Sequence, residues 1–171
     1  MSRLDGMRVA VLTVSDRVAS GTRDDAGGSA LCGLLEDAGA EVVSRAVVAD
    51  EREPIAAAVR SMAADADVVL TTGGTGLGPR DVTPEATRAV LDREAPGIVE
   101  ALRAASLAIT PFAMLSRATA GLVGRALVVN LPGNPKAVRE EWAVLAPVLA
   151  HAVETARGPV PDERHQHPPA G

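Results

Sequence analysis

Hydrophobic residues form short blocks along the chain. Nearly continuous apolar blocks alternate with blocks in which apolar residues recur at helical spacing. Four blocks are rich in Val and nearly continuously apolar, which is typical of strands buried on both faces of a parallel sheet. Between them apolar residues recur at helical spacing, as Leu31, Leu34, Leu35 and Ala38 do before the predicted C-cap Gly39. The predicted strands cover residues 7–15, 40–50, 67–72 and 125–131, and the predicted helices cover residues 29–39, 53–66, 84–95, 96–106 and 135–156.

The start of the third predicted helix carries clear sequence signals. Thr83 is predicted to be its N-cap, Pro84 suits the first helical position, and Glu85 lies favourably near the positive end of the helix dipole. Residues 109–124, between the fourth helix and the last strand, are predicted to be irregular. Because strands and helices alternate, the sequence predicts the α/β class: a three-layer αβα sandwich with a mostly parallel central sheet.

Length and composition indicate how many domains the chain has and which classes of partner are unsuited to it. A chain of 171 residues favours one domain, predicted over 1–157, while 158–171 is rich in Pro and polar residues and is expected to be disordered. The net charge of -5 and the 1% of aromatic residues argue against a nucleic-acid partner. No apolar run approaches the ~20 residues of a membrane span and no secretory signal is evident, so we expect a cytoplasmic protein without a membrane partner.

The segment VVLTTGGTGLGPRDVTPEAT, residues 68–87, leads from a predicted strand into a glycine-rich turn. Gly73, Gly74 and Gly76 leave room for backbone N–H groups to approach an anion, and Thr75 adds a hydroxyl, so a phosphate-bearing ligand fits. The segment contains neither a Walker loop nor a dinucleotide-binding fingerprint. A tight turn that requires positive φ is an equally good interpretation of the glycines taken alone.

Polar residues also follow the other predicted strands. Ser15 ends the first strand, Asp50 ends the second, and Asn134 follows the last. In an open parallel sheet the carboxyl ends of the strands form the ligand-binding edge, so we expect these residues to converge with Asp81, which follows the glycines. The Asp81 carboxylate could cap the helix, ligate Mg²⁺ bound to phosphates or orient a nucleophile, and a solvated ion pair with Arg80 is the simpler alternative.

Five blocks of the sequence, taken together, resemble a known family. The blocks TTGGTG, PRDVTPEAT, LDREAPGI, ITPFAMLSRATAG and VVNLPGNPKAV are similar to segments of the MogA/MoaB family and of the G domain of gephyrin-type proteins, over about residues 7–156. The resemblance implies a domain that binds molybdopterin. It also implies molybdopterin adenylyltransferase activity, in which MgATP supplies AMP to the terminal phosphate of molybdopterin and pyrophosphate is released.

The same resemblance assigns roles to individual residues. It places Asp81 on a carboxylate essential to the reaction and Asp50 on the second functional aspartate of the family. We expect these two carboxylates to position Mg²⁺ or the reactants, since Mg²⁺ takes one or two protein carboxylates and keeps several waters. The substrate-binding residues expected from the resemblance or from the predicted sheet edge are Gly73, Gly74, Thr75, Gly76, Ser15, Ser116, Pro132, Gly133 and Asn134.

Two other functions fit parts of this pattern. One is a non-catalytic molybdopterin-binding or scaffold protein of MoaB type, and the other is a relative of the CinA-type domains that handles another nucleotide or pterin. Asp81 and Asp50 favour the enzyme over the scaffold, and the matches at LDREAPG and ITPFAMLSRATAG disfavour the CinA type. The resemblance further implies a homo-oligomer, a trimer or sometimes a hexamer, and a molybdate-insertion protein as a partner.

Overall fold

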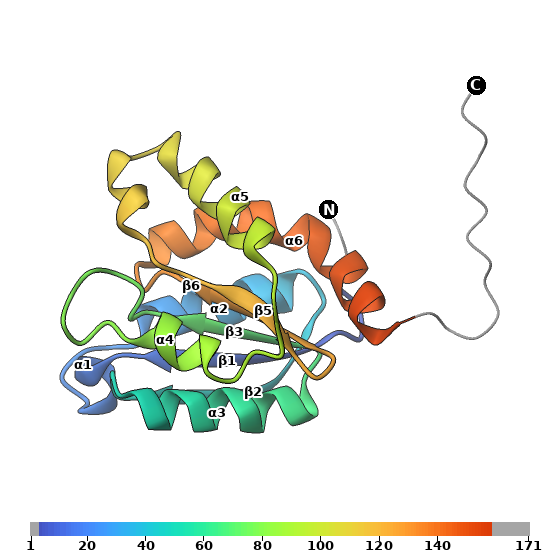
Figure 1. Ribbon diagram of the computed structural model, residues 1–171, viewed down its shortest axis with the longest axis horizontal. Coiled ribbons are helices and arrows are strands. Elements are labelled where there is room, and N and C mark those ends of the chain that lie inside the picture. Colours follow the sequence, from blue (N-terminus) through green and yellow to red (C-terminus); the bar gives the residue numbers. More distant parts are fainter. Residues whose placement is uncertain (1–3, 159–171) are drawn as a thin grey trace.

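The computed structural model describes residues 4–158 and contains a central sheet with helices on both of its faces (Figure 1). The strands are β1 (Arg8–Val14), β2 (Glu41–Val48), β3 (Val68–Thr72), β4 (Arg93–Glu94), β5 (Ala120–Val123) and β6 (Ala126–Leu131). The helices are α1 (Asp16–Ala19), α2 (Ala26–Asp37), α3 (Arg52–Asp65), α4 (Thr83–Arg88), α5 (Pro96–Leu107) and α6 (Pro135–Arg157), with a 3-10 helix η1 (Pro111–Leu115).

The sheet has six strands in the order β2-β1-β3-β6-β5-β4. The β2–β1, β1–β3 and β3–β6 pairs are parallel, whereas β5 runs antiparallel to both β6 and β4. The α/β class and the mostly parallel sheet predicted from the sequence are therefore confirmed. The four parallel strands end at one edge of the sheet, and this edge carries the loops that follow β1, β2, β3 and β6.

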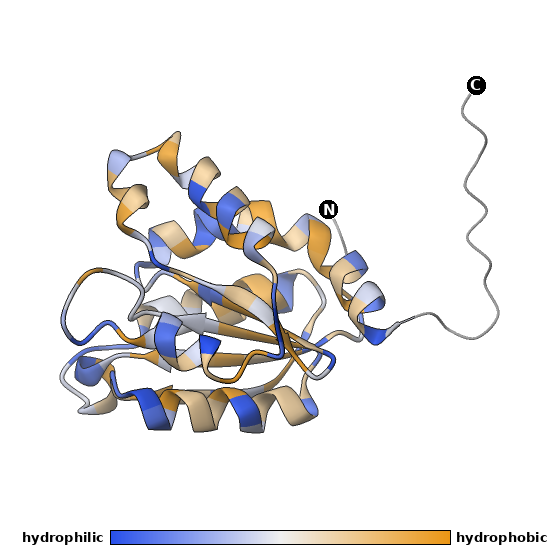
Figure 2. Ribbon diagram, in the orientation of Figure 1, coloured by the Kyte–Doolittle hydropathy of each residue, from blue (hydrophilic) through white to orange (hydrophobic). Residues whose placement is uncertain are grey.

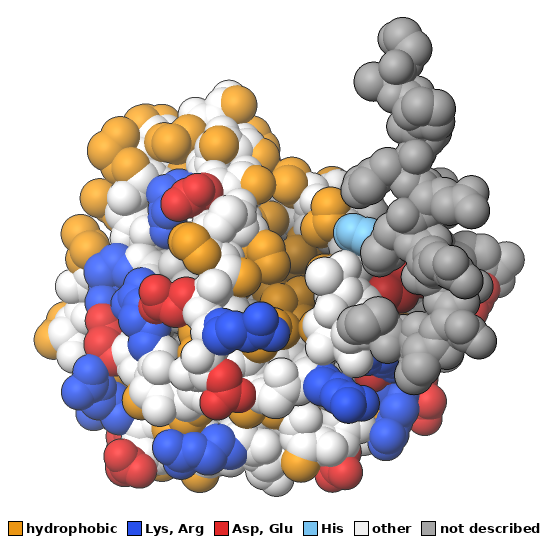
Figure 3. All heavy atoms as spheres, turned by 45° about the vertical axis from the view of Figure 1, so that its right-hand side comes forward, with side chains coloured by type: hydrophobic (Ala, Val, Ile, Leu, Met, Phe, Trp, Pro, Cys, Tyr) orange, Lys and Arg blue, Asp and Glu red, His pale blue; other side chains and the backbone are white. Residues whose placement is uncertain are grey.

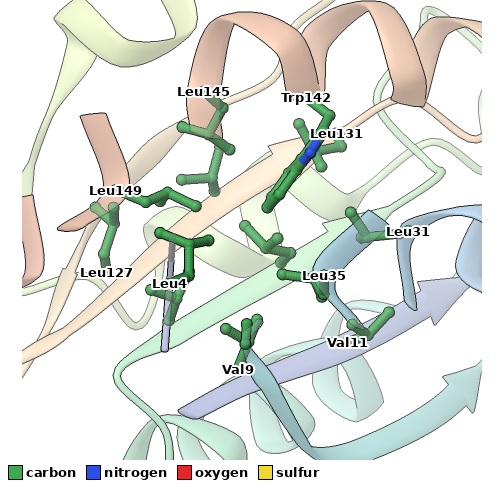
Figure 4. Packing of buried hydrophobic residues seen from close by; sticks show 14 of the residues in the cluster. Leu4, Val9, Val11, Leu31, Leu35, Leu127, Leu131, Trp142, Leu145 and Leu149 are labelled. Carbon is green, nitrogen blue, oxygen red and sulfur yellow. The ribbon is translucent and has the colours of Figure 1, made fainter. Parts of the chain in front are cut away.

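Two apolar cores lie on opposite faces of the sheet, and β1 shows how one strand supplies both. Val9 and Val11 belong to the core under α2, α5 and α6, whereas Ala10, Leu12 and Val14 pack against α3 and α4. Side chains alternate across a strand, so a strand that is buried on both faces has to be apolar at every position. Labelled residues of the first core in Figure 4 include Val9, Val11, Leu31, Leu35, Leu131, Trp142, Leu145 and Leu149.

The helices show the complementary pattern, with one apolar side and one polar side. Ile55 and Val59 of α3 are fully buried, while Arg52 and Arg60 on the same helix are exposed. Figure 2 shows hydrophobic colours along the strands and alternating colours around α3. This distribution is the helical periodicity that the sequence predicted.

The prediction that Thr83 is the N-cap of the third long helical segment is wrong. Val82 occupies the N-cap position and makes no side-chain cap hydrogen bond, while Thr83 is the first residue of α4. The Thr83 side chain is fully buried, and its Oγ1 donates to the carbonyl oxygen of Gly73 at 2.9 Å. The hydroxyl therefore fixes the turn after β3 instead of capping the helix.

Residues 84–95 and 109–124 also differ from the prediction. The helix that starts at Thr83 ends at Arg88, and β4 follows where the helix was expected to continue. β4 pairs with β5, which lies in the segment predicted to be irregular, through Arg93 opposite Leu122 and Glu94 opposite Gly121. This pairing joins residues far apart in sequence, so the local pattern did not reveal it.

The predicted tail 158–171 lies, apart from Gly158, outside the described residues. Among the helices of residues 4–158, none is long and apolar enough to cross a membrane.

Candidate functional site

A pocket of about 750 Å³ opens at the carboxyl ends of the four parallel strands. Its wall is formed by residues 13–18, 23–27, 72–76, 80–81 and 133–135, together with Asp50. Each of the four parallel strands therefore sends its following loop into one cavity, as the topology of an open parallel sheet predicts. The longest of these loops, residues 73–82, is called the glycine loop below. It extends beside α1 at the left of Figure 1.

Two glycines of the glycine loop adopt backbone conformations that favour glycine. Gly73 has a φ of 98° and Gly74 a φ of 67°. A Cβ atom at Gly73 would collide with the carbonyl oxygen of Val14, and one at Gly74 would collide with Thr83 Oγ1. The interpretation of these glycines as a tight turn with positive φ is thus correct, and the turn brings the loop backbone to the pocket wall.

The carbonyl oxygens of four successive residues in the glycine loop, 73–76, accept hydrogen bonds. Thr83 donates its side-chain hydroxyl to the oxygen of Gly73 and its N–H to the oxygen of Gly74, at 2.9 and 3.1 Å. Arg117 donates its N–H to the oxygen of Thr75 and its Nε to the oxygen of Gly76, at 2.9 and 2.7 Å. Two residues, each with one backbone donor and one side-chain donor, therefore fix the direction of four peptide units.

The N–H groups of the same peptide units point the other way. In a trans peptide the C=O and the following N–H lie on opposite sides, and the described part of the chain contains no cis peptide. Among residues 4–158, no group accepts a hydrogen bond from the N–H of Gly74, Thr75 or Gly76. All three residues line the pocket. This run of unpaired donors is suited to bind an anion, as the backbone of a phosphate-binding loop does.

The Asp81 carboxylate is held inside the glycine loop and not at the start of α4. Its Oδ2 accepts a hydrogen bond from the N–H of Gly78 at 2.9 Å, while the N–H of Asp81 donates to the oxygen of Gly78. Asp81 Oδ2 also lies against Gly76, where an added Cβ would be 2.9 Å away. The capping role considered for Asp81 is therefore not seen, and its carboxylate lines the pocket.

Asp50 and Asp16 join the loops after β2 and β1 by a pair of reciprocal hydrogen bonds. Asp16 N–H donates to Asp50 Oδ2 at 2.8 Å, and Asp50 N–H donates to Asp16 Oδ1 at 3.0 Å. Arg80 then donates from Nε and Nη2 to both oxygens of Asp16, each at 3.0 Å. The ion pair considered for Arg80 is thus made with Asp16 across the pocket, and not with Asp81 beside it.

The charges around Asp50 are unevenly compensated. Burial raises the pKa of Asp50 above its ordinary value, and the negative charges of Asp16 and Asp81 raise it further, against the hydrogen bond from the Asp16 backbone. The pKa of Asp16 is lowered instead, chiefly by its hydrogen bond from Arg80. Arg80 therefore pairs with Asp16 and offsets the effects of burial and neighbouring carboxylates on Asp50 only in part.

Asp50 and Asp81 place two carboxylates in the pocket wall, which is the number that Mg²⁺ commonly takes from a protein when phosphates are also bound. Among the described residues, no group of three or more His, Cys, Asp or Glu side chains could hold a metal ion. Mg²⁺ needs less than that, because it usually takes one or two carboxylates and fills its other positions with water and substrate phosphates. Asp50 Oδ1 accepts no hydrogen bond within residues 4–158, so it has a free oxygen to offer.

Several other predicted site residues also meet at the pocket. Ser15 caps α1 through its Oγ, and Asn134 caps α6 through its Oδ1, which accepts from the N–H of Lys136 at 2.9 Å. Gly133 lines the pocket opposite Gly27, whose added Cβ would lie 2.6 Å from the Gly133 oxygen. Gly27 and Gly133 thus let two backbone segments of the pocket wall approach each other closely, because a Cβ atom at Gly27 would collide with the Gly133 oxygen.

Two predicted site residues, Ser116 and Pro132, do not lie in the pocket wall. Ser116 Oγ accepts from the N–H of Ala118 at 3.4 Å, while the carbonyl oxygen of Pro132 accepts from Thr72 Oγ1 at 2.7 Å. Lys136, the only lysine, is largely exposed and has its Nζ 3.8 Å from Glu140. The substrate-binding roles of Ser116 and Pro132 remain predictions.

Two residues of the site, Arg117 and Asp25, were not predicted from the sequence. Arg117 lies in the block ITPFAMLSRATAG, directly after the predicted Ser116, yet nothing in its local sequence indicates contact with Gly76, 41 positions away. Asp25 was also missed: it lies in the pocket wall, accepts from Gly28 N–H and Thr13 Oγ1 at 2.9 Å, and pairs with Arg45. This network fixes the start of α2 at the pocket, whereas the sequence analysis placed the start of that helix at residue 29.

Comparison with known proteins places these features in a family. A molybdopterin adenylyltransferase of Helicobacter pylori strain J99 is 37% identical over 156 residues, covering 89% of each chain. A molybdopterin adenylyltransferase of Haemophilus influenzae is 39% identical over 138 residues, covering 78% of this chain and 70% of that protein. The crystal structure of the molybdopterin biosynthesis enzyme MoaB from Thermus thermophilus matches with a TM-score of 0.84 and 46% identity, over 90% of this chain and 98% of that one.

One family profile matches most of the described part of the chain. The sequence profile of the MoCF_biosynth family, described as a probable molybdopterin binding domain, matches residues 10–151. This range runs from β1 into α6 and includes all four loops that form the pocket. The chain therefore belongs to the MoCF_biosynth family.

Proposed function

We propose that this chain is a molybdopterin adenylyltransferase acting in molybdenum cofactor biosynthesis. In this reaction a phosphate oxygen of molybdopterin attacks the α-phosphorus of ATP, the bond between the α- and β-phosphates breaks, and pyrophosphate leaves. The observation that carries the proposal is one pocket wall that combines the unpaired N–H groups of Gly74, Thr75 and Gly76 with the carboxylates of Asp50 and Asp81. The activity named for the two adenylyltransferase relatives supports it.

The main task of the site is to bring anionic groups together. The loop N–H groups offer fixed positive dipoles that need no rearrangement when a phosphate arrives. Arg17, Arg23 and Arg80 also line the pocket and supply full positive charges. Arg80 is bound to Asp16 in the structure, so an incoming phosphate competes with that carboxylate for the guanidinium. Holding both substrates in one cavity removes most of the entropic barrier to their encounter.

We assign the binding of Mg²⁺ to Asp50 and Asp81. The pKa of Asp50 is raised first by burial and then by the negative charges of Asp16 and Asp81, and a bound cation would favour the ionised carboxylate. When bound, the ion neutralises phosphate charge and makes the α-phosphorus more electrophilic. The hydrogen bond from Gly78 holds Asp81 in the loop, so this carboxylate is presented in one orientation.

The further properties of the protein are proposed from the family resemblance and from the surface. We assign the ligand-binding domain to residues 1–157, place the protein in the cytoplasm, and expect a homotrimer or hexamer that passes its product to a molybdate-insertion protein. Five apolar side chains near the end of α5 and in η1 support self-association, because each is at least 42% exposed: Leu107, Ile109, Phe112, Met114 and Leu115. Figure 3 shows hydrophobic side chains gathered at the top of the molecule, where these elements lie.

One assay tests the activity and its alternative together. The purified protein is incubated with molybdopterin and MgATP, and adenylylated molybdopterin and pyrophosphate are measured, with Asp81→Asn as the inactive control. Formation of both products by the wild-type protein alone supports the enzyme. Tight molybdopterin binding without either product would instead identify a non-catalytic binding or scaffold protein.

A further inference from the structure

Arg117 makes more contacts with the glycine loop than its position in the sequence suggests. Besides the bonds to the oxygens of Thr75 and Gly76, its Nη2 donates to the carbonyl oxygen of Asp81 at 2.5 Å, and its Nη1 forms an ion pair with Glu85 Oε1. The guanidinium thus joins the two ends of the exposed segment 77–80. One side chain therefore holds residues 76 and 81 together, and these two residues are called the neck of the glycine loop below.

The segment whose two ends the Arg117 guanidinium holds includes Asp81, one of the groups proposed to act on phosphate. Asp81 Oδ2 lies between Gly76 and Gly78, at the neck. The peptide units whose oxygens Arg117 holds also carry the N–H groups of Gly76 and Leu77, which therefore point away from Arg117. The guanidinium itself holds the oxygens of Gly76 and Asp81, so the direction of the Leu77 N–H and the position of Asp81 depend on it, whereas the Gly76 N–H is oriented through the backbone N–H of Arg117.

Glu85 keeps the guanidinium in place from the other side. The Arg117 hydrogen bond and charge lower the pKa of Glu85 despite the opposing effect of its burial, so the carboxylate is ionised and paired. Glu85 Oε2 is buried and has no hydrogen-bond partner among the described residues, so Oε1 makes the bond to Arg117. The ion pair ties the neck of the loop to the first turn of α4, which Thr83 connects to Gly73 and Gly74.

We propose that Arg117 is a positioning residue for phosphate binding: it does not touch the phosphate, but its guanidinium fixes the glycine loop at Gly76 and Asp81, which line the pocket beside the N–H groups that bind the phosphate. The inference rests on the proposed function, because it assumes that the glycine loop binds a phosphate. A planar guanidinium can reach two carbonyl oxygens and a carboxylate at once, which the single ammonium group of lysine cannot do. The role therefore requires arginine and not merely a positive charge.

The test uses inorganic pyrophosphate, which probes the loop without molybdopterin or turnover. Amide signals of Gly74 and Gly76 in the ¹⁵N-labelled protein are followed during a pyrophosphate titration. In the wild-type protein we expect both signals to shift and saturate. In Arg117→Met we expect affinity to fall about tenfold or more, equal to about 1.4 kcal/mol, and Arg117→Lys should recover only part of it.

Two further variants separate positioning from stability. Arg157→Met breaks an ion pair with Asp67, which precedes β3 at the opposite end of the sheet, so it controls for the loss of an arginine contact. It should lower the melting temperature without changing pyrophosphate affinity. The double variant Arg117→Met with Glu85→Gln avoids leaving a half-buried carboxylate without its partner. It should fold and still bind pyrophosphate weakly.

The outcomes distinguish the inference from the proposed function. If wild-type Gly74 and Gly76 do not respond to pyrophosphate, the phosphate-binding role of the loop fails, and the inference fails with it. If the wild-type signals shift and Arg117→Met binds as tightly as the wild type, the inference alone is overturned. Full recovery of affinity by Arg117→Lys would also overturn it, because a positive charge would then be sufficient.

Discussion

Glu141 offers a stability prediction whose sign and size come from its surroundings. Its side chain lies on α6 and is buried, and Oε1 accepts a hydrogen bond from Ser106 Oγ on α5 at 3.3 Å. Burial raises its pKa to about 7, because the hydrogen bond from Ser106 and the positive charge of Arg103 only partly offset the loss of solvation, while Glu140 adds a negative charge.

The sign of the effect follows from proton binding. Between the ordinary value of 4.5 and about 7, the folded protein keeps Glu141 protonated while the unfolded chain has lost that proton. The free energy of unfolding therefore falls as the pH rises through this window and levels off above it. The full shift corresponds to a loss on the order of 3 kcal/mol at most, since one pKa unit is equivalent to about 1.4 kcal/mol.

Glu141→Gln keeps the hydrogen-bond acceptor and cannot ionise. We expect it to be nearly neutral at pH 5 and to exceed the wild type in unfolding free energy by about 1–3 kcal/mol at pH 8. Urea unfolding at several pH values, with the m-value checked for constancy, measures the difference. Glu154→Gln, at an exposed position of the same helix, is the matched control and should show no such growth with pH. Parallel pH profiles for Glu141→Gln and wild type would refute the reasoning.

Three further predictions concern the site and the end of the chain. Asp81→Asn should reduce adenylyl transfer about a hundredfold or more in a product assay, while calorimetry finds little change in melting temperature, because Asp81 does not cap α4. Gly74→Ala should destabilise the fold by more than about 1 kcal/mol, given its φ of 67°; titration of the folded fraction with molybdopterin should also show weaker binding, and unchanged affinity would limit this glycine to the turn. A chain that ends at Gly158 should keep its activity and oligomeric state in the same assay and in light scattering, since residues 159–171 lack apolar periodicity.

The strands of the parallel part of the sheet were predictable because burial on both faces leaves a purely local signal. Val9 to Leu12 are apolar at every position, and the same holds for Val68 to Leu70, so no distant contact is needed to identify these strands. β4 is only two residues long and exists through its pairing with β5. Its sequence, Arg-Glu, also fits a helix, and only the neighbouring strand decides between the two.

The site was predictable to the extent that topology determines it. Ser15, Asp50, Asp81 and Asn134 follow four strands that run in one direction, and the structure brings all four into one pocket wall. The contacts made by Arg117 were not predictable, because its guanidinium acts on backbone atoms of residues that any sequence could supply. Backbone carbonyls carry no sequence signature, so a side chain that serves them is recognised only in three dimensions.

The row of unpaired N–H groups in the glycine loop has a consequence for the conditions under which the pocket can hold an anion. A backbone amide has no ionisable proton in the range that proteins experience, so these donors keep the same strength in acid and in base. They also cannot be removed by acetylation, methylation or exchange of a single side chain, since every residue but proline provides one. The contribution of these donors to anion capture should therefore be insensitive to pH, and any pH dependence should originate in the carboxylates of the pocket, which include Asp81 in this loop, or in the substrates themselves.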